Sequence, residues 1–258
     1  MPAKKEQSFK AARILLLDIE TAPNLGFTWG KWEQNVIEFK EHWYMLSFSM
    51  KWLGERSAHT YALPDFSGYN ASKRDDSKLI KKLHGILDEA DVVIAHNGNR
   101  FDVRKSNARF IANGLTPPSP YKTIDTLKIA RQKFAFDSNK LDDLGKYLGV
   151  GRKLPTTHKW QMWLKCMTGE MAAWDKMKKY NTQDVKLLER VYLKLRPWAT
   201  SLPDLTSYSK KNGCPSCEST NLHKRGVNVT KTGSRERLHC QDCGAWSSGM
   251  KFTRQGRS

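Results

Sequence analysis

The sequence predicts an α/β fold, a mixed β-sheet flanked by helices, with a small second module at the C-terminal end. Two short apolar runs, at 13–19 and 91–96, have the length and composition of strands buried on both faces. Two longer segments, 77–90 and 170–195, are helical: the first gathers its apolar residues on one side, and the second contains no Gly or Pro. Because strands come first and then alternate with helices, we expect a mixed sheet with helices packed on it.

Four further elements complete the large domain. We expect strands at 43–52 and 57–63, where they would form a meander, and helices at 100–112 and 140–148. An Asn-Gly pair follows the first of these helices and a Gly follows the second, which is how helices commonly end.

The end of the large domain is marked by Pro197 and Pro203. They predict that the long helix ends near Trp198 and that a linker follows it. We therefore expect one domain at 1–205 and a second at 206–258. The second carries 10 Lys and Arg against 3 acidic residues, so it is densely basic.

The charge of the whole chain narrows its partners. The 258 residues have a formal net charge of +18, and a field of this sign attracts polyanions, of which nucleic acid is the commonest. A generally solvated basic surface is the alternative. No apolar run approaches the ~20 residues that span a bilayer. The apolar run nearest the N-terminus, at 14–17, is also shorter than the apolar core of a secretory signal, which has roughly 7–15 residues. We expect a cytoplasmic protein without membrane contact, in the host cytoplasm if the chain is viral.

Acidic side chains stand at the ends of two predicted buried strands. Asp18 and Glu20 flank Ile19, so both carboxylates point to the same side of the strand. Burying them unpaired is costly, and a divalent cation would remove that cost because Mg²⁺ and Mn²⁺ prefer oxygen ligands. A strand end that has reached solvent is the alternative. Asp102 follows the other strand after a polar turn, where α/β proteins place ligands.

A second pair of polar residues completes a recognisable pattern. Tyr180 and Asp184 lie four apart in the long helix, on one face; taken alone, they also fit a helix surface with no role. Together with Asp18-Ile-Glu-Thr21 and His96-Asn-x-x-x-Phe-Asp102, they resemble the three exonuclease motifs of the DnaQ-like superfamily, in the family's order. The tyrosine matches the DEDDy branch, which includes the proofreading domains of family B DNA polymerases. The resemblance implies an RNase H-like fold.

The resemblance also implies a metal-dependent 3′–5′ exonuclease that uses two Mg²⁺ or Mn²⁺ ions. Asp18, Glu20 and Asp184 would hold one ion. Asp18 would bridge to a second ion, which Asp102 would bind directly or through water. Two cations about 3.5–4 Å apart stabilise both the attacking and the leaving oxygen of a phosphodiester. Tyr180 would position the attacking water, because a phenol with a pKa of about 10 is a poor base near neutral pH.

Other residues are expected to contact the nucleic acid. Thr21 and Asn97 would touch the terminal nucleotide. A basic and aromatic segment before the long helix contains Lys153, Lys159 and Trp160, which would hold the strand; ordinary packing is the alternative.

Four cysteines predict a metal site in the second module. They form two C-x₂-C pairs with 22 residues between them: Cys214, Cys217, Cys240 and Cys243. Two such pairs complete a tetrahedron around one Zn²⁺, and with a hairpin between them they resemble a zinc ribbon. Four basic residues of the module would contact nucleic acid: Lys224, Arg225, Arg235 and Arg237. The alternative is a charged ribbon that docks on protein.

These expectations favour an exonuclease that removes nucleotides from the 3′ ends of DNA, with the zinc ribbon aiding binding. Two alternatives stay open: an exoribonuclease of the same superfamily, and a nucleic-acid-binding module recruited to a replication or repair complex. Proofreading by such an exonuclease would need a partner polymerase in trans, so we expect a replication or repair protein as a partner.

Overall fold

The structure is a computed structural model that describes residues 10–32, 35–155, 159–209, 211–231 and 233–252. Its main part is a five-stranded sheet with helices on both faces. The strands are β1 (Ile14–Thr21), β4 (Met45–Trp52), β5 (His59–Ala62), β6 (Val92–Ala95) and β7 (Lys122–Asp125). The helices are α1 (Ser77–Asp88), α2 (Asp102–Ala112), α3 (Thr126–Lys133), α4 (Leu141–Tyr147), α5 (Lys159–Thr168) and α6 (Met171–Leu195).

The central sheet is mixed, as predicted. Its strand order is β5-β4-β1-β6-β7. The strand β1 lies antiparallel to β4 and parallel to β6, while β5 is antiparallel to β4 and β7 is parallel to β6. The first strand, β1, therefore lies in the middle of the sheet. The meander of β4 and β5 extends the sheet on one side, and the parallel strands β6 and β7, which follow helical crossovers, extend it on the other.

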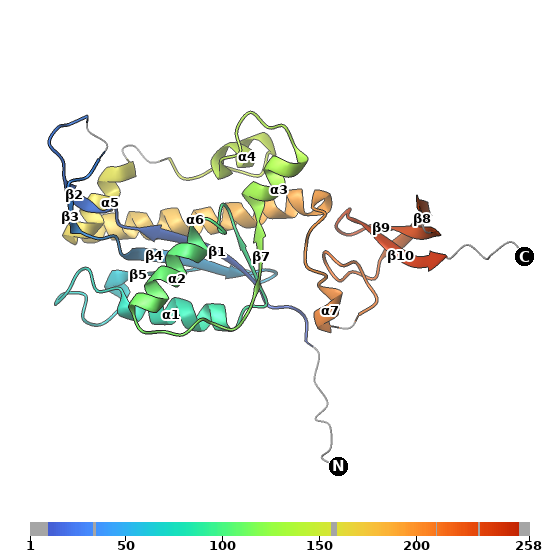
Figure 1. Cartoon of the computed structure of the whole chain (residues 1–258), viewed down its shortest axis with the longest axis horizontal. Helices are drawn as coiled ribbons and strands as arrows, with labels where there is room; N and C mark the ends of the chain where they lie inside the picture. The colour runs from blue at the N-terminus through green and yellow to red at the C-terminus, as the bar shows by residue number, and fades with distance from the viewer. Residues whose placement is uncertain (1–9, 33–34, 156–158, 210, 232, 253–258) are drawn as a thin grey trace, which may run out of the picture. The chain divides into compact units, whose positions relative to one another are not determined.

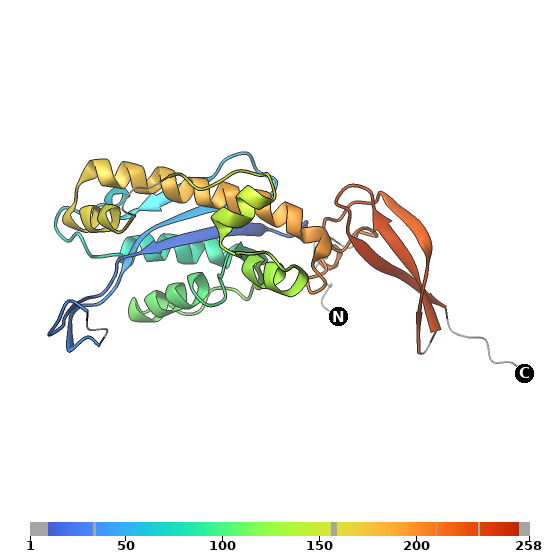
Figure 2. The ribbon, with the colours of Figure 1, turned by 90° about the horizontal axis from the view of Figure 1, so that it is seen from above.

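Helices cover both faces of this sheet. The long helix α6 crosses one face, and α1 and α2 lie against the other, which both views show (Figures 1 and 2). Neighbouring residues of β1 are buried alike, with Leu15 and Leu16 both 0% exposed. Because successive side chains of a strand point to opposite faces, this pattern places β1 between two layers of side chains.

A small hairpin follows β1 and was not predicted. It consists of β2 (Leu25–Phe27) and β3 (Glu38–Glu41). At Gly26, β2 approaches β3 and the residues before it: an added Cβ would lie 2.4 Å from a methyl carbon of Val36 and 2.9 Å from the carbonyl oxygen of Glu38. Beyond this contact, Trp29 and Trp32 are 86% and 84% exposed, so apolar residues here do not mark a buried strand.

The C-terminal segment contains a second sheet. Its strands are β8 (Leu222–Thr230), β9 (Gly233–Cys240) and β10 (Trp246–Phe252), paired antiparallel in the order β10-β9-β8. The predicted hairpin between the cysteine pairs is formed by β8 and β9. The expected linker contains a short helix, α7 (Thr206–Ser209).

The chain divides into two compact units. One comprises residues 13–128 and 136–191, and the other takes the described parts of 1–12, 129–135 and 192–258. This division falls within α3 and α6, earlier than the expected boundary at residue 205, so a separately folding module at 206–258 stays a prediction. Among the described residues, no helix is long and apolar enough to cross a bilayer.

Candidate metal centre and nuclease site

The strand β1 presents two acids on one side of the sheet. Ile19 is 2% exposed and packs in the core, whereas Asp18 and Glu20 on either side of it are only partly buried. Across the pairing with β4, Asp18 lies opposite Ser49 and Glu20 opposite Ser47. Directly opposed side chains share one face of a sheet. Small serines at these positions leave room for the carboxylates.

A third carboxylate joins them from α6. Asp184 is 0% exposed, and one oxygen of its carboxylate lies within 4.8 Å of one from Asp18 and one from Glu20. Residues more than 160 positions apart in the chain meet because α6 crosses the face of the sheet that carries the two acids (Figure 2). Three converging oxygen donors are the ligand type that Mg²⁺ and Mn²⁺ prefer.

The electrostatics of this cluster fit a cation. Burial raises the pKa of Asp18 well above its ordinary value, and the charges of Glu20 and Asp184 raise it further. A bound divalent cation would offset both effects, because it stabilises the ionised carboxylates. The three residues therefore match the donor set that a hard divalent metal requires.

Lys153 supplies positive charge to the same cluster. Its Nζ atom lies 2.5 Å from Oδ2 of Asp184 and donates a hydrogen bond of 3.2 Å to the hydroxyl of Tyr180. The lysine side chain is only 22% exposed. It therefore contacts the acids themselves, which the sequence did not indicate.

Tyr180 lies one helical turn before Asp184 and is 3% exposed. Burial raises the pKa of its hydroxyl, and the neighbouring Asp184 raises it further. The phenol therefore stays protonated near neutral pH, which suits a group that donates or orients rather than one that takes a proton.

Asn181 fixes the position of Asp18 and was missed by the sequence analysis. Its amide nitrogen donates to Oδ2 of Asp18 at 2.5 Å, and its amide oxygen accepts a hydrogen bond of 3.2 Å from the hydroxyl of Ser47. Asn181 is 0% exposed, so this contact links α6 to β1 and β4 inside the protein. Its place between Tyr180 and Asp184 is the only sequence signal that pointed to it.

Asp102 stands beside the three-acid cluster. It is the first residue of α2, is 3% exposed, and accepts a 3.0 Å hydrogen bond from the backbone N–H of Ile19. Burial raises its pKa to about 7. Its charge in turn raises the pKa of Asp18, although its oxygens are not part of the cluster within 4.8 Å. Direct metal binding by Asp102 stays a prediction.

Asn97 shapes the turn that precedes Asp102. Its backbone adopts a φ of +64°, and its N–H donates to Oδ1 of Asp125 at 2.9 Å. The same Asp125 oxygen accepts the N–H of Leu127 at 3.0 Å, at the start of α3. Asp125 thus supports the turn structurally. Contact of the Asn97 side chain with a nucleotide stays a prediction.

An aromatic cleft lies next to the acids. It has a volume of about 590 Å³ and is lined by Thr21, which follows Glu20 directly, and by Trp43, Lys105 and Trp160. The Lys105 ammonium lies 3.6 Å from the centre of the Trp43 ring, and Trp160 is 63% exposed. Two predicted nucleic-acid contacts, Thr21 and Trp160, therefore share one surface. The side chain of Lys159 lies outside the described residues.

The four cysteines of the second unit converge. Their four sulfur atoms lie within 4.8 Å of one another. Cys214 Sγ is 3.6 Å from Cys243 Sγ, and Cys217 Sγ is 3.7 Å from Cys240 Sγ. A tetrahedron with Zn–S bonds of about 2.3 Å has edges of about 3.8 Å. The arrangement therefore fits a four-coordinate structural metal. Gly244, with a φ of +77°, supplies the turn after the last cysteine.

The basic residues of this unit are exposed and partly engaged. Lys224 forms an ion pair of 2.7 Å with an acid of β9. The Arg237 guanidinium lies 5.4 Å from the centre of the Trp246 ring and donates to the carbonyl of Arg225. Arg235 is exposed on β9 as well. Contact of these residues with nucleic acid stays a prediction.

Comparison with known proteins supports the fold. A solved structure, that of the family B DNA polymerase from the hyperthermophilic archaeon Pyrobaculum calidifontis, aligns with a TM-score of 0.54 and 18% identity over 73% of this chain and 25% of that chain. A curated plant protein, Protein NEN3 of Arabidopsis thaliana, is 35% identical over 77 residues, which are 29% of this chain and 15% of NEN3. The chain matches only a small part of either protein.

A protein-family model also matches the chain, over a longer stretch than NEN3 does. The model described as RNase_H superfamily matches residues 38–196. This range contains Asp102, Tyr180 and Asp184 and begins after the two acids of β1. It spans more than half of the sequence and coincides with most of the central sheet and its covering helices. The chain belongs to the RNase H superfamily.

Proposed function

We propose that the protein is a metal-dependent 3′–5′ exonuclease of the DEDDy type. The convergence of the Asp18, Glu20 and Asp184 carboxylates beside Tyr180 carries this proposal. Membership of the RNase H superfamily and the similarity in fold to a family B DNA polymerase support it. The product would be a nucleotide released from a strand end by hydrolysis of the last phosphodiester bond.

The acidic residues and Tyr180 would have different roles in hydrolysis. Asp18, Glu20 and Asp184 would hold Mg²⁺ or Mn²⁺, and Asp102 would hold a second ion. When bound, the ions supply charge stabilisation for the attacking and leaving oxygens. Tyr180, kept protonated by burial, would orient the attacking water through its hydroxyl.

The aromatic cleft suits the base at the strand end. A nucleobase has two flat faces, and stacking on aromatic side chains is worth about 1–3 kcal/mol per base without demanding one sequence. Trp43 and Trp160 line the cleft within reach of Thr21, which follows the metal-binding acids in the chain. A terminal nucleotide bound here would have its phosphate close to the proposed ions.

The four cysteines of the second unit would bind one Zn²⁺, and this unit would increase the affinity of the protein for nucleic acid. The sulfur spacing supports the metal, and the exposed Arg235 and Arg237 support contact with phosphate. We propose DNA as the preferred substrate and a replication or repair protein as a partner in trans. The protein would act in the cytoplasm.

A digestion assay tests the proposal. A 5′-labelled single strand incubated with Mg²⁺ or Mn²⁺ should shorten to a ladder of products, and chelator should stop the reaction. Asp18→Ala and Asp184→Ala should stop it too. A ladder that persists in both variants would contradict the proposal. Matched DNA and RNA strands in parallel decide between a deoxyribonuclease and an exoribonuclease.

A further inference from the structure

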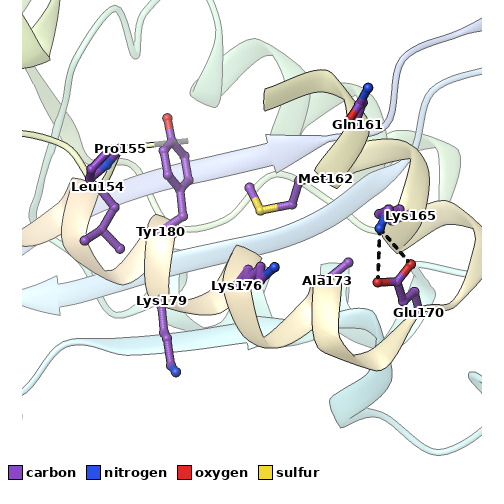
Figure 3. A pocket seen from close by; sticks show the side chains of 10 residues that line it. All are labelled: Leu154, Pro155, Gln161, Met162, Lys165, Glu170, Ala173, Lys176, Lys179 and Tyr180. Atoms are coloured by element: carbon purple, nitrogen blue, oxygen red, sulfur yellow. Dashed lines mark hydrogen bonds and ion pairs between the residues drawn. The ribbon is translucent and has the colours of Figure 1, made fainter. Parts of the chain in front are cut away.

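A second pocket opens between α5 and α6, on the side of α5 away from the aromatic cleft. It has a volume of about 450 Å³ (Figure 3). From α6 it is lined by Ala173, Lys176 and Tyr180, which the 3-residue and 4-residue spacing places on one side of the helix. Tyr180 thus lies at the junction between this pocket and the acid cluster, because its hydroxyl accepts from the lysine that pairs with Asp184.

The rim of this pocket is cationic. Three lysines line it: Lys165, Lys176 and Lys179. Lys165 forms an ion pair of 3.4 Å with Glu170, an acidic residue that also lines the pocket. Among the residues that the structure describes, Lys176 and Lys179 pair with no carboxylate, and both are exposed. The Lys179 side chain extends away from Tyr180 and Met162 (Figure 3), so the two lysines place their positive charge along the rim of the pocket, not inside it.

The rest of the lining is apolar. Leu154 and Met162 face the cavity from opposite sides, with the ring of Tyr180 between them (Figure 3). The volume falls in the range of about 300–1,000 Å³ that small-ligand pockets occupy. A ligand that matches both halves carries an anion at one end and a flat or apolar body at the other.

We propose that this pocket binds a nucleotide unit, with its phosphate against Lys176 and Lys179 and its sugar or base against Leu154 and Met162. The proposal rests on the exonuclease function, because it is the strand ending at the acids that would bring nucleotides to Tyr180. The unit is either part of the substrate strand upstream of its 3′ end or a released nucleoside 5′-monophosphate. Both share the chemistry that the pocket offers.

Binding measured in chelator tests the pocket without requiring hydrolysis. The variant Lys176→Ala/Lys179→Ala removes two charges from the pocket. The matched control Lys186→Ala/Lys194→Ala removes two charges from exposed positions of the same helix, outside the pocket. Each protein is titrated into a fluorescent ten-nucleotide single strand at several salt concentrations, and thermal melting of each confirms folding.

The pocket variant should bind on the order of tenfold more weakly at physiological salt. Its slope of log affinity against log salt should be shallower by about 1.4, because each lost single-strand phosphate contact removes about 0.7. The control should change both quantities by much less. Equal losses in the two variants would overturn the proposal, since they would reflect net charge alone, and so would no loss in either.

Competition by nucleoside 5′-monophosphates separates the two sources of the nucleotide. If they displace the strand from the wild type but not from the pocket variant, the pocket takes free product. If they fail to displace it while the pocket variant still binds the strand weakly, the pocket holds a segment of the substrate. The exonuclease proposal fails on a different result: in the digestion assay, the wild-type protein with metal would give no ladder of products.

Discussion

Lys153 and Asp184 form an ion pair in which the Asp184 side chain is fully buried and the Lys153 side chain is 22% exposed, with Nζ 2.5 Å from Oδ2. Because Asp184 is more deeply buried than Lys153, its charge depends more on the ion pair than the charge of the lysine does. Without Lys153, the Asp184 carboxylate would have to stay ionised in the interior near Asp18, or take up a proton. The lysine thus acts as an internal counter-ion for the acid cluster.

Lys153→Met should therefore destabilise the metal-free protein. Breaking a buried pair by removing one partner costs about 3–5 kcal/mol, and the partial exposure of Lys153 reduces this to roughly 1–3 kcal/mol. Because a divalent cation at Asp184 would replace the lost charge, adding Mn²⁺ should narrow the difference. Thermal melting with and without chelator measures this. A gap that is the same in both conditions would show that no cation reaches Asp184.

The buried Asp102 predicts a pH dependence of stability. Its pKa is raised to about 7 in the folded protein, so between about pH 4 and 7 the folded state holds a proton that the unfolded state has lost. The free energy of unfolding should then fall as pH rises through this window, by up to about 1.4 kcal/mol per unit for this group.

Asp102→Asn should flatten that profile while still accepting the N–H of Ile19 through its amide oxygen. Urea denaturation in chelator at several pH values between 4.5 and 8 provides the measurement. Asp18 also has a raised pKa and should preserve part of the slope. Profiles that run parallel for wild type and variant would rule out Asp102 as a source.

Asn181 is expected to control activity without binding substrate. Residues that orient metal ligands typically change activity by 10–100-fold when replaced, so Asn181→Ala should lower kcat in that range by releasing Asp18. Gln183→Ala on the same helix is the control, because Gln183 contacts the backbone of Arg152 instead. The two variants should differ in the Mn²⁺ concentration needed for half-maximal activity. Equal metal requirements would mean that Asn181 does not position Asp18.

The cysteine cluster predicts one tightly bound zinc per chain. Cys217→Ser should lower the zinc content and unfold the β8–β10 sheet, because a structural metal supplies much of the folding free energy of a small unit. Cys166→Ala is the matched cysteine control; Cys166 lies buried in the core of the other unit. Elemental analysis of the purified proteins reports the zinc. Normal zinc in Cys217→Ser would contradict the assignment.

The main elements could be predicted from the sequence because their burial follows simple periods. The strands β1 and β6 are short apolar runs, and α1 carries its apolar residues on one side. The acids of β1 were found because alternation fixes their side of the strand, and Asp184 because helical spacing pairs it with Tyr180.

Other features depend on contacts that no local pattern encodes. Lys153 lies in a loop, and only the fold reveals that its charge reaches Asp184. The β2–β3 hairpin was missed because Trp29 and Trp32 are exposed apolar residues, which break the rule that links hydrophobicity to burial. The helix α5 was not predicted either. Its residues line two pockets together with residues that are distant in the sequence, and no local pattern encodes those contacts.

Binding of Mn²⁺ is the most direct test of the acid cluster. Titration of the full chain, followed by electron paramagnetic resonance, should show Mn²⁺ bound to the wild type, and Asp18→Asn with Asp184→Asn should lose that binding together with digestion of a 3′ end. If the double variant binds the same number of Mn²⁺ ions with the same affinity as the wild type, the carboxylates of β1 and α6 do not form the metal centre.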